Sequence, residues 1–169
     1  MDNQRLAEMI REVHVAMLVT FPPDGRPCAR PMATQGPEPD EFDGSLWFMT
    51  DSNSAKVGQL AQNPEVLVTY AAPQKHLFVA VNGTASVRHD PERARKLWSL
   101  TAQGWWPEGP DSQSFVLIEV QVTFAECWKG PSMPCFSFQL ARALISGERI
   151  NADAEHHVVA PHGSHCAES

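Results

Sequence analysis

Short stretches of apolar residues, separated by turn-forming residues, predict a chain built mainly of β-strands. The residues from Pro22 to Gly25 read PPDG, a strong turn signal, so the strands on either side are expected to form a hairpin. Asn82 and Gly83 predict a bulge or tight bend within a later strand. The predicted strands cover residues 14–21, 27–35, 46–50, 65–70, 77–88 and 114–128.

Helical periodicity marks four further segments. In the first, Leu6, Met9 and Ile10 fall on one face of a helix. In the third, Asp90 followed by Pro91 is typical of a helix start. The predicted helices cover residues 3–12, 54–62, 90–100 and 136–145, and exposed loops are expected at 36–43 and 103–112.

This order of elements favours a mainly β fold. Hairpin connections dominate, so an antiparallel β-barrel or strongly curved sheet with flanking helices fits better than a doubly wound parallel sheet. One domain is predicted over residues 1–150. From residue 151 onward the chain is polar and rich in His, which predicts a flexible tail. The His and Cys spacing in this tail matches no closed metal site, so no metal is expected.

Composition narrows the classes of partner and compartment. The formal net charge of -7 disfavours nucleic acid or an anionic membrane as a partner. No apolar run reaches transmembrane length, and the charged amino-terminal segment does not resemble a signal peptide. The four cysteines form no CxxC pair. They are therefore expected to be reduced thiols in a cytoplasmic protein.

Lys56 lies in an unusual place, in the first turn of a predicted helix. The amino end of a helix carries a partial positive charge, so a cation there is repelled unless an anion lies nearby. One interpretation is a phosphate site formed by helix N–H groups, Lys56 and the hydroxyls of Thr50, Ser52 and Ser54. The other is a solvated lysine on an exposed helix face, offset by Asp51.

A series of short motifs extends this interpretation. They are Arg30-Pro31-Met32, Trp47-Phe48-Met49-Thr50, Ser54-Ala55-Lys56-Val57, Asn63-Pro64-Glu65-Val66, Val81-Asn82-Gly83-Thr84-Ala85, Leu97-Trp98, Trp105-Trp106-Pro107-Glu108-Gly109 and Ala125-Glu126-Cys127-Trp128. In this order they resemble the pyridoxamine 5′-phosphate oxidase-like FMN-binding split-barrel superfamily, and within it the general stress protein 26 group, over residues 5–146. The resemblance implies a six-stranded antiparallel split barrel, a homodimer, and FMN bound in a groove at the dimer interface.

The same resemblance implies which residues bind the cofactor. Arg30 matches a family position that faces the flavin and its phosphate, and Ser54 and Lys56 match phosphate-binding positions. With an anion between them, Arg30 and Lys56 would form charge-assisted hydrogen bonds. The resemblance thus assigns an anion to the lysine that the helix start leaves unexplained.

The flavin ring is expected to contact a second group of residues. Met49 and Thr50 match the strand end along which the ring and ribityl chain lie, and Trp128 matches a tryptophan that approaches the flavin from the partner subunit. Trp105 and Trp106 have two readings that the sequence leaves open. They either cover the flavin or pack over a barrel end or across the dimer interface.

Several positions depart from pyridoxamine 5′-phosphate oxidases proper. Those enzymes have an Arg-x-His motif after the strand that contains Trp128, whereas this chain has no histidine between Trp128 and His156. Ala55 replaces an arginine and Phe78 replaces a polar residue that faces the cofactor, while Cys127 stands where the stress-protein group commonly has tyrosine. These departures argue against pyridoxal phosphate synthesis.

The function expected from the resemblance is that of an FMN-binding protein of the general stress type, acting as a flavin-dependent oxidoreductase on an unidentified substrate. The alternative is a non-catalytic flavin-binding redox sensor or flavin reservoir, and a third reading is a barrel that has lost its flavin. FAD or another flavin fits the same phosphate-binding residues. No residue is assigned a catalytic role.

Overall fold

The structure is a computed structural model that describes residues 3–36, 39–131, 140, 142–145 and 155–159. The helices are α1 (Asn3–Val13), α2 (Ala55–Gln62), α3 (Pro91–Leu97) and α4 (Leu100–Trp105), with single 3₁₀ turns η1 (Pro39–Glu41) and η2 (Pro73–Lys75). The strands are β1 (Val15–Thr20), β2 (Cys28–Gln35), β3 (Ser45–Asp51), β4 (Glu65–Ala72), β5 (Leu77–Arg88), β6 (Phe115–Lys129) and β7 (Glu155–Val159).

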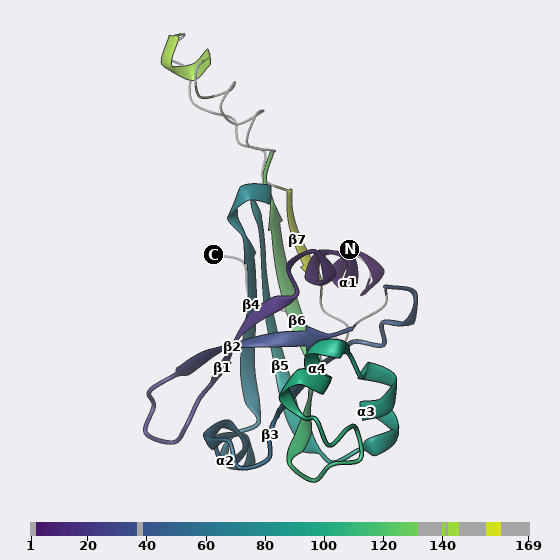
Figure 1. Cartoon of the computed structure of the whole chain (residues 1–169). Coiled ribbons are helices and arrows are strands. Elements are labelled where there is room, and N and C mark those ends of the chain that lie inside the picture. Colours follow the sequence, from purple (N-terminus) through teal and green to yellow (C-terminus); the bar gives the residue numbers. More distant parts are fainter. Residues whose placement is uncertain (1–2, 37–38, 132–139, 141, 146–154, 160–169) are drawn as a thin grey trace.

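Six of these strands close into an antiparallel barrel (Figure 1). The order is β3-β2-β1-β4-β5-β6, and β3 pairs back with β6 to complete the ring. The expected β1–β2 hairpin is present, with Val15 opposite Ala33 and Thr20 opposite Cys28. The prediction of a mainly β fold, a six-stranded antiparallel split barrel with flanking helices, is therefore confirmed.

The long strand β6 has a different neighbour along each half. Its first half lies between β3 and β5, and its second half lies between β5 and β7. The strand β7 was not expected, because its five residues carry no clear alternation and lie in a polar segment. A strand added at an edge is held largely by backbone hydrogen bonds, which composition does not reveal. Half of the predicted helix at 136–145 falls outside the described residues, and those described within it, 140 and 142–145, are helical.

The barrel interior holds the main hydrophobic core. Leu6 and Ile10 of α1 are fully buried in this core, together with Phe48 and Val68 from the strands and, nearly so, Leu60 of α2. Each buried side chain of this size contributes about 1.5–3 kcal/mol. The apolar face predicted for the first helix therefore packs α1 on the barrel, and Leu60 does the same for α2.

A bend in β5 is required by a close backbone approach. The register with β6 shifts between Asn82 and Gly83, as the sequence predicted. A Cβ atom at Gly83 would lie 2.6 Å from the carbonyl oxygen of Gln121. Only glycine fits there without movement of the neighbouring strand.

A second cluster lies outside the barrel, where α3 and α4 pack on β3 and β6. Trp98 and Trp106 contact Phe115 with ring centroids 5.6 Å and 5.2 Å apart. The predicted single helix at 90–100 is in fact two, because Ser99 caps a new helix by accepting a hydrogen bond from the Ala102 N–H. Residues 103–105 of the predicted loop are therefore helical.

Candidate functional site

Lys56 is held by two hydroxyl groups at the start of α2. Its Nζ donates to Thr50 Oγ1 at 2.8 Å and to Ser54 Oγ at 2.7 Å. Ser54 is the N-cap residue, yet its side chain makes no capping hydrogen bond. The first N–H groups of a helix lack partners within the helix. The end of β3 and the start of α2 thus combine a cation, two hydroxyls and helix N–H groups.

Arg30 is oriented by a closed set of three hydrogen bonds. Its Nη1 donates to Thr20 Oγ1 at 2.8 Å and its Nη2 donates to Gln59 Oε1 at 2.8 Å. The Thr20 hydroxyl donates in turn to the same Gln59 oxygen at 2.7 Å. Because Thr20 is fully buried, this arrangement places the guanidinium firmly between β1, β2 and α2.

The two cations lie close enough to repel each other. The pKa of Lys56 is lowered, first by burial and second by the positive charge of Arg30, while Asp51 acts in the opposite direction. Within the described chain, every hydrogen-bond partner of the Arg30 and Lys56 side chains is a neutral oxygen. Two neighbouring cations that lack a paired carboxylate form a niche for an anion, and we call this pair with its hydroxyl partners the cation niche.

A cleft of about 530 Å³ opens beside the cation niche. Met49 and Thr50 line it, and Thr50 joins it to the niche because its hydroxyl also accepts from Lys56. Val15 forms part of the wall, and Trp105 of α4 and its C-cap residue Trp106 line it from outside the barrel. The cleft is therefore largely apolar and adjoins a pair of positive charges through Thr50, an arrangement suited to a flat ring with an anionic tail.

The expected site residues do not all fall in one place. Arg30, Ser54 and Lys56 gather in the cation niche, and Met49 and Thr50 lie at its junction with the cleft, as described above. Trp128 lies elsewhere, because β6 places Val116 opposite Thr50 and Trp128 a further 12 residues along. At ~3.3 Å per residue this is about 40 Å of strand. Trp128 is thus remote from the niche of its own chain, and its contact with a flavin in the partner stays a prediction.

Ser52 does not belong to the niche. Its hydroxyl donates to the Ser114 carbonyl oxygen at 3.2 Å, which holds the β3 end to the start of β6. Trp105 and Trp106 combine features of the two interpretations given for them above, a cover over the flavin and a packing contact. Trp106 packs on Phe115, whereas Trp105 remains 75% exposed at the rim of the cleft.

Sequence reasoning missed Thr20 and Gln59. Gln59 follows Lys56 by three residues, so a helical pattern places both on one face of α2, which was the available signal. Thr20 is opposite Cys28 in the hairpin, and this register brings it to Arg30. That contact required knowledge of the strand pairing.

Cys127 is not activated, and the titratable groups that the structure describes form no metal cluster. The Cys127 side chain is buried, and burial, followed by the charge of Glu126, raises its pKa to about 11. Cys127 is thus a protonated, buried residue of β6. Among the residues that the structure describes, no three His, Cys, Asp or Glu side chains are grouped to hold a metal.

Comparison with known proteins agrees with this geometry. Residues 2–151 match the family described as pyridoxamine 5′-phosphate oxidase like. The chain belongs to the pyridoxamine 5′-phosphate oxidase-like family. None of the curated proteins matches the chain. The described helices of this family member include none that is long and apolar enough to cross a bilayer.

Solved structures share the fold of this family member. A protein assigned as general stress protein 26 from Jannaschia sp. CCS1 has a TM-score of 0.73 at 20% identity, over 90% of this chain and 94% of that one. General stress protein 26 from Bacillus anthracis str. Sterne has a TM-score of 0.61 at 24% identity, over 73% and 93%. The general stress FMN/FAD binding protein from Xanthomonas citri has a TM-score of 0.66 at 23% identity, over 77% and 89%. At these identities the likeness concerns the fold.

Proposed function

We propose that this chain binds FMN, with the phosphate in the cation niche and the ring system in the adjoining cleft. The observation that carries the proposal is the pair of cations, Arg30 and Lys56, whose hydrogen-bond partners in the described chain are all neutral. Both side chains would donate charge-assisted hydrogen bonds to a phosphate, which would also remove their mutual repulsion. The FMN/FAD binding protein from Xanthomonas citri, which shares the fold, supports this class of ligand.

In this proposal, different residues of the site contact the phosphate, the ribityl chain and the ring of FMN. Ser54 and the first N–H groups of α2 add neutral donors around the phosphate. Thr50 orients the ribityl chain at the junction, and Met49 and Trp106 exclude water from the ring. The flavin supplies hydride or electron transfer when it is bound. The protein provides the phosphate contacts and the apolar surroundings.

We further propose that the bound flavin serves as the cofactor of a cytoplasmic oxidoreductase whose substrate enters beside the exposed Trp105. Pyridoxamine 5′-phosphate oxidation is not proposed, because Ala55 and the absent Arg-x-His motif remove contacts that those enzymes use. One observation favours the non-catalytic alternative. Asp51 is the one titratable side chain among the cleft-lining residues that the structure describes, so proton donors are few.

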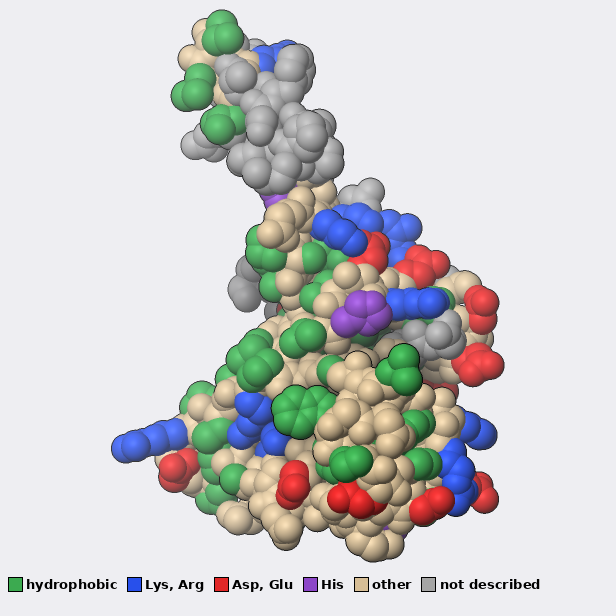
Figure 2. All heavy atoms as spheres, in the orientation of Figure 1, with side chains coloured by type: hydrophobic (Ala, Val, Ile, Leu, Met, Phe, Trp, Pro, Cys, Tyr) green, Lys and Arg blue, Asp and Glu red, His purple; other side chains and the backbone are tan. Residues whose placement is uncertain are grey.

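The flavin is proposed to lie between two copies of the chain. The outer face of β1, β2, β4 and β5 carries exposed apolar side chains, among them Val15, Met17 and Phe78, which are 53%, 40% and 42% exposed. Figure 2 shows hydrophobic side chains gathered on this side of the barrel, beside the cleft. Trp128 pairs with Phe78 across β5 and β6, and paired residues share a face, so Trp128 points to the same side. This face, which we call the apolar face, supports a homodimer.

The direct test is the visible absorption spectrum of the purified protein, followed by titration of the stripped protein with FMN. Lys56→Ala and Arg30→Ala should each weaken FMN binding by at least about tenfold, since a hydrogen bond to a charged group contributes about 1.5–3 kcal/mol. Lys75→Ala is the matched control, because Lys75 pairs with Glu12 at the surface and lines neither the niche nor the cleft.

The outcomes separate the three readings. Flavin reduction by a nicotinamide donor with turnover to an acceptor supports the oxidoreductase. Tight flavin binding without turnover over a panel of donors supports the sensor or reservoir. A protein that takes up no FMN, or that binds FMN equally after both niche substitutions, overturns the assignment.

A further inference from the structure

A second cavity, of about 450 Å³, lies where β2 ends and β3 begins, and neither Arg30 nor Lys56 of the cation niche lines it. The end of α1, η1, the start of β3 and α3 surround it, and Figure 1 shows α1 and α3 on opposite sides of this region. Its lining and that of the proposed flavin cleft share Gln35 alone among the described residues. The proposed function uses none of its other residues, so the cavity calls for a separate explanation.

Cationic and imidazole side chains gather around this cavity. They come from two elements that are far apart in sequence, with Arg11 and His14 from the end of α1 and Arg93 and Lys96 from α3. This concentration of positive charge is unusual in a chain whose formal net charge is -7. It indicates a ligand with negative charge.

Arg93 is placed to recognise a flat molecule. Its guanidinium carbon lies 4.6 Å from the centroid of the Trp47 ring, and Trp47 is only 7% exposed. The guanidinium is therefore supported from one side, which leaves its other face and its N–H edge available. Within the described chain, the side chains of Arg93 and Lys96 make no hydrogen bond or ion pair.

His14 is fixed at the edge of the cavity by an unusual backbone conformation. Its φ is 61°, in the left-handed region, and its N–H donates to the Ile10 carbonyl at 3.1 Å where α1 ends. Its own carbonyl accepts from the Thr34 N–H at 2.9 Å. A residue other than glycine in this conformation costs about 1 kcal/mol or more, and such positions cluster at binding sites.

Two carboxylates on one wall of the cavity restrict how a ligand can lie. Glu41 of η1 and Asp43, just before β3, line the cavity, and Asp43 accepts a hydrogen bond from the Ser45 N–H at 3.0 Å. They repel an anion from that wall. A bound molecule would therefore direct its negative group to α3 and a neutral or hydrogen-bond-donating part to Glu41.

We infer that this cavity is a second small-molecule site, for a planar compound that carries a phosphate or carboxylate group. The ring stacks on the free face of Arg93, and the anionic group accepts hydrogen bonds from Arg93 and Lys96. The inference does not depend on flavin binding, because the cation niche and this cavity use different cations. The two can be tested separately in the same protein.

The test is calorimetric titration of the full chain with four probes. Phenyl phosphate and benzoate carry a ring and an anion, inorganic phosphate carries only the anion, and benzyl alcohol only the ring. Phenyl phosphate and benzoate should bind more tightly than the other two probes. Arg93→Gln, which keeps most of the side-chain length over Trp47, should weaken phenyl phosphate binding by about tenfold. Lys96→Ala should weaken it several-fold.

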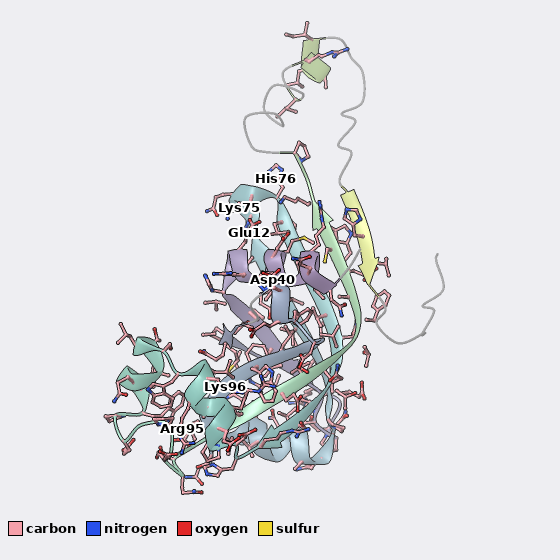
Figure 3. The ribbon with its side chains drawn as sticks, turned by 90° about the vertical axis from the view of Figure 1, so that its right-hand side faces the viewer. Glu12, Asp40, Lys75, His76, Arg95 and Lys96 are labelled. Atoms are coloured by element: carbon pink, nitrogen blue, oxygen red, sulfur yellow. The ribbon has the colours of Figure 1, made fainter. Side chains whose placement is uncertain are left out.

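Neighbouring residues on α3 provide a matched control. Lys96 lines the cavity, whereas Arg95 pairs with Asp111 and does not line it; both are labelled in Figure 3. Arg95→Ala should therefore leave phenyl phosphate binding within about twofold. If Arg93→Gln fails to fold, as judged by circular dichroism, the exposed Lys96 still carries the test.

Three results would overturn the inference. The first is failure of both ring-bearing anions to bind at millimolar concentration. The second is equal weakening by Arg95→Ala and Lys96→Ala. The third is loss of phenyl phosphate binding in Lys56→Ala with full binding in Arg93→Gln, which would place the probe in the cation niche. If Lys56→Ala loses FMN binding but keeps phenyl phosphate binding, the second site stays supported. Such a result bears only on the proposed flavin site.

Discussion

Lys56 and Arg30 show how single residues can form a candidate anion site at a cost to the fold. Neutral groups hold both cations, and no carboxylate among the described residues pairs with either. The lowered pKa of Lys56 reports this unfavourable environment. A site of this kind is completed by the ligand, because the ligand removes the repulsion that the side chains maintain.

Keeping Lys56 charged in the folded protein should lower the free energy of unfolding, and this effect should depend on pH. Its pKa is lowered from 10.5, so the unfolded chain holds this proton more tightly than the folded chain. Stability from this residue therefore rises as the pH increases through the lowered value toward 10.5. We expect the free energy of unfolding of the wild type, relative to Lys56→Met, to increase between neutral and alkaline pH. Urea unfolding of both proteins without ligand checks this, and a difference that stays constant or falls contradicts it.

Gln59 should act on flavin binding through Arg30. Gln59→Leu removes the oxygen that accepts from Arg30 Nη2 and from the Thr20 hydroxyl. A hydrogen bond of this kind contributes about 1 kcal/mol, so FMN binding should weaken about fivefold. Gln62→Leu, on the exposed side of the same helix, should leave FMN binding unchanged. Fluorescence titration of both variants measures the difference, and equal affinities would show that Gln59 does not position Arg30.

These residues also mark how far the candidate site was predictable. Lys56 could be singled out from the sequence because the helix dipole repels a cation at a helix start. Arg30 was singled out by the resemblance. Thr20 and Gln59 were not predictable from the sequence, because their contacts with Arg30 depend on the pairing of β1 with β2 and on where α2 packs. The contact between Arg93 and Trp47 was equally unpredictable, since 46 positions separate them in the sequence.

Among the elements, patterns of apolar residues predicted the barrel strands well. The predicted and observed strands agree closely from β1 to β6, because each alternates or runs apolar between strong turn signals. The separation of α3 from α4 was missed, although Ser99 is a good cap, because the apolar pattern continues through Trp98. The strand β7 was missed because edge pairing leaves little trace in composition.

Two glycines give a matched test of the barrel elements. A Cβ at Gly83 would press on the backbone of β6, whereas one at Gly58 in α2 would meet nothing within 4 Å. Gly83→Ala should lower the free energy of unfolding by about 1–3 kcal/mol through overpacking. Gly58→Ala should raise it by about 0.5–1 kcal/mol through helix propensity. Urea unfolding compares them, and a Gly83→Ala protein as stable as the wild type would contradict the close approach at the β5 bend.

For the molecule as a whole, the apolar face and the position of Trp128 both bear on whether two copies of the chain form the flavin site together. Exposed apolar side chains cover one side of the barrel, next to the cleft. Trp128 lies on that side but remote from the niche of its own chain. If two copies meet through this face, the partner subunit's Trp128 can approach the flavin. Dimer formation and flavin binding should then be linked.

Met17→Asp tests this linkage from a position outside the niche and the cleft lining. Met17 lies on the apolar face, opposite Pro31 and Thr69, and is 40% exposed. A carboxylate buried there without a partner should dissociate the dimer, because an unpaired buried charge costs several kcal/mol. FMN binding should weaken as the dimer is lost, although Arg30 and Lys56 are intact. Light scattering with FMN titration measures both effects.

The exposed Ala61 of α2 supplies the control for that experiment. Ala61→Asp introduces the same charge outside the apolar face, so it should leave both dimerisation and FMN affinity unchanged. Added FMN should also shift wild-type protein toward the dimer, since a ligand held between two copies stabilises their association. A wild-type protein that stays monomeric with FMN bound would place the whole flavin site within one chain. It would also remove the role proposed for Trp128.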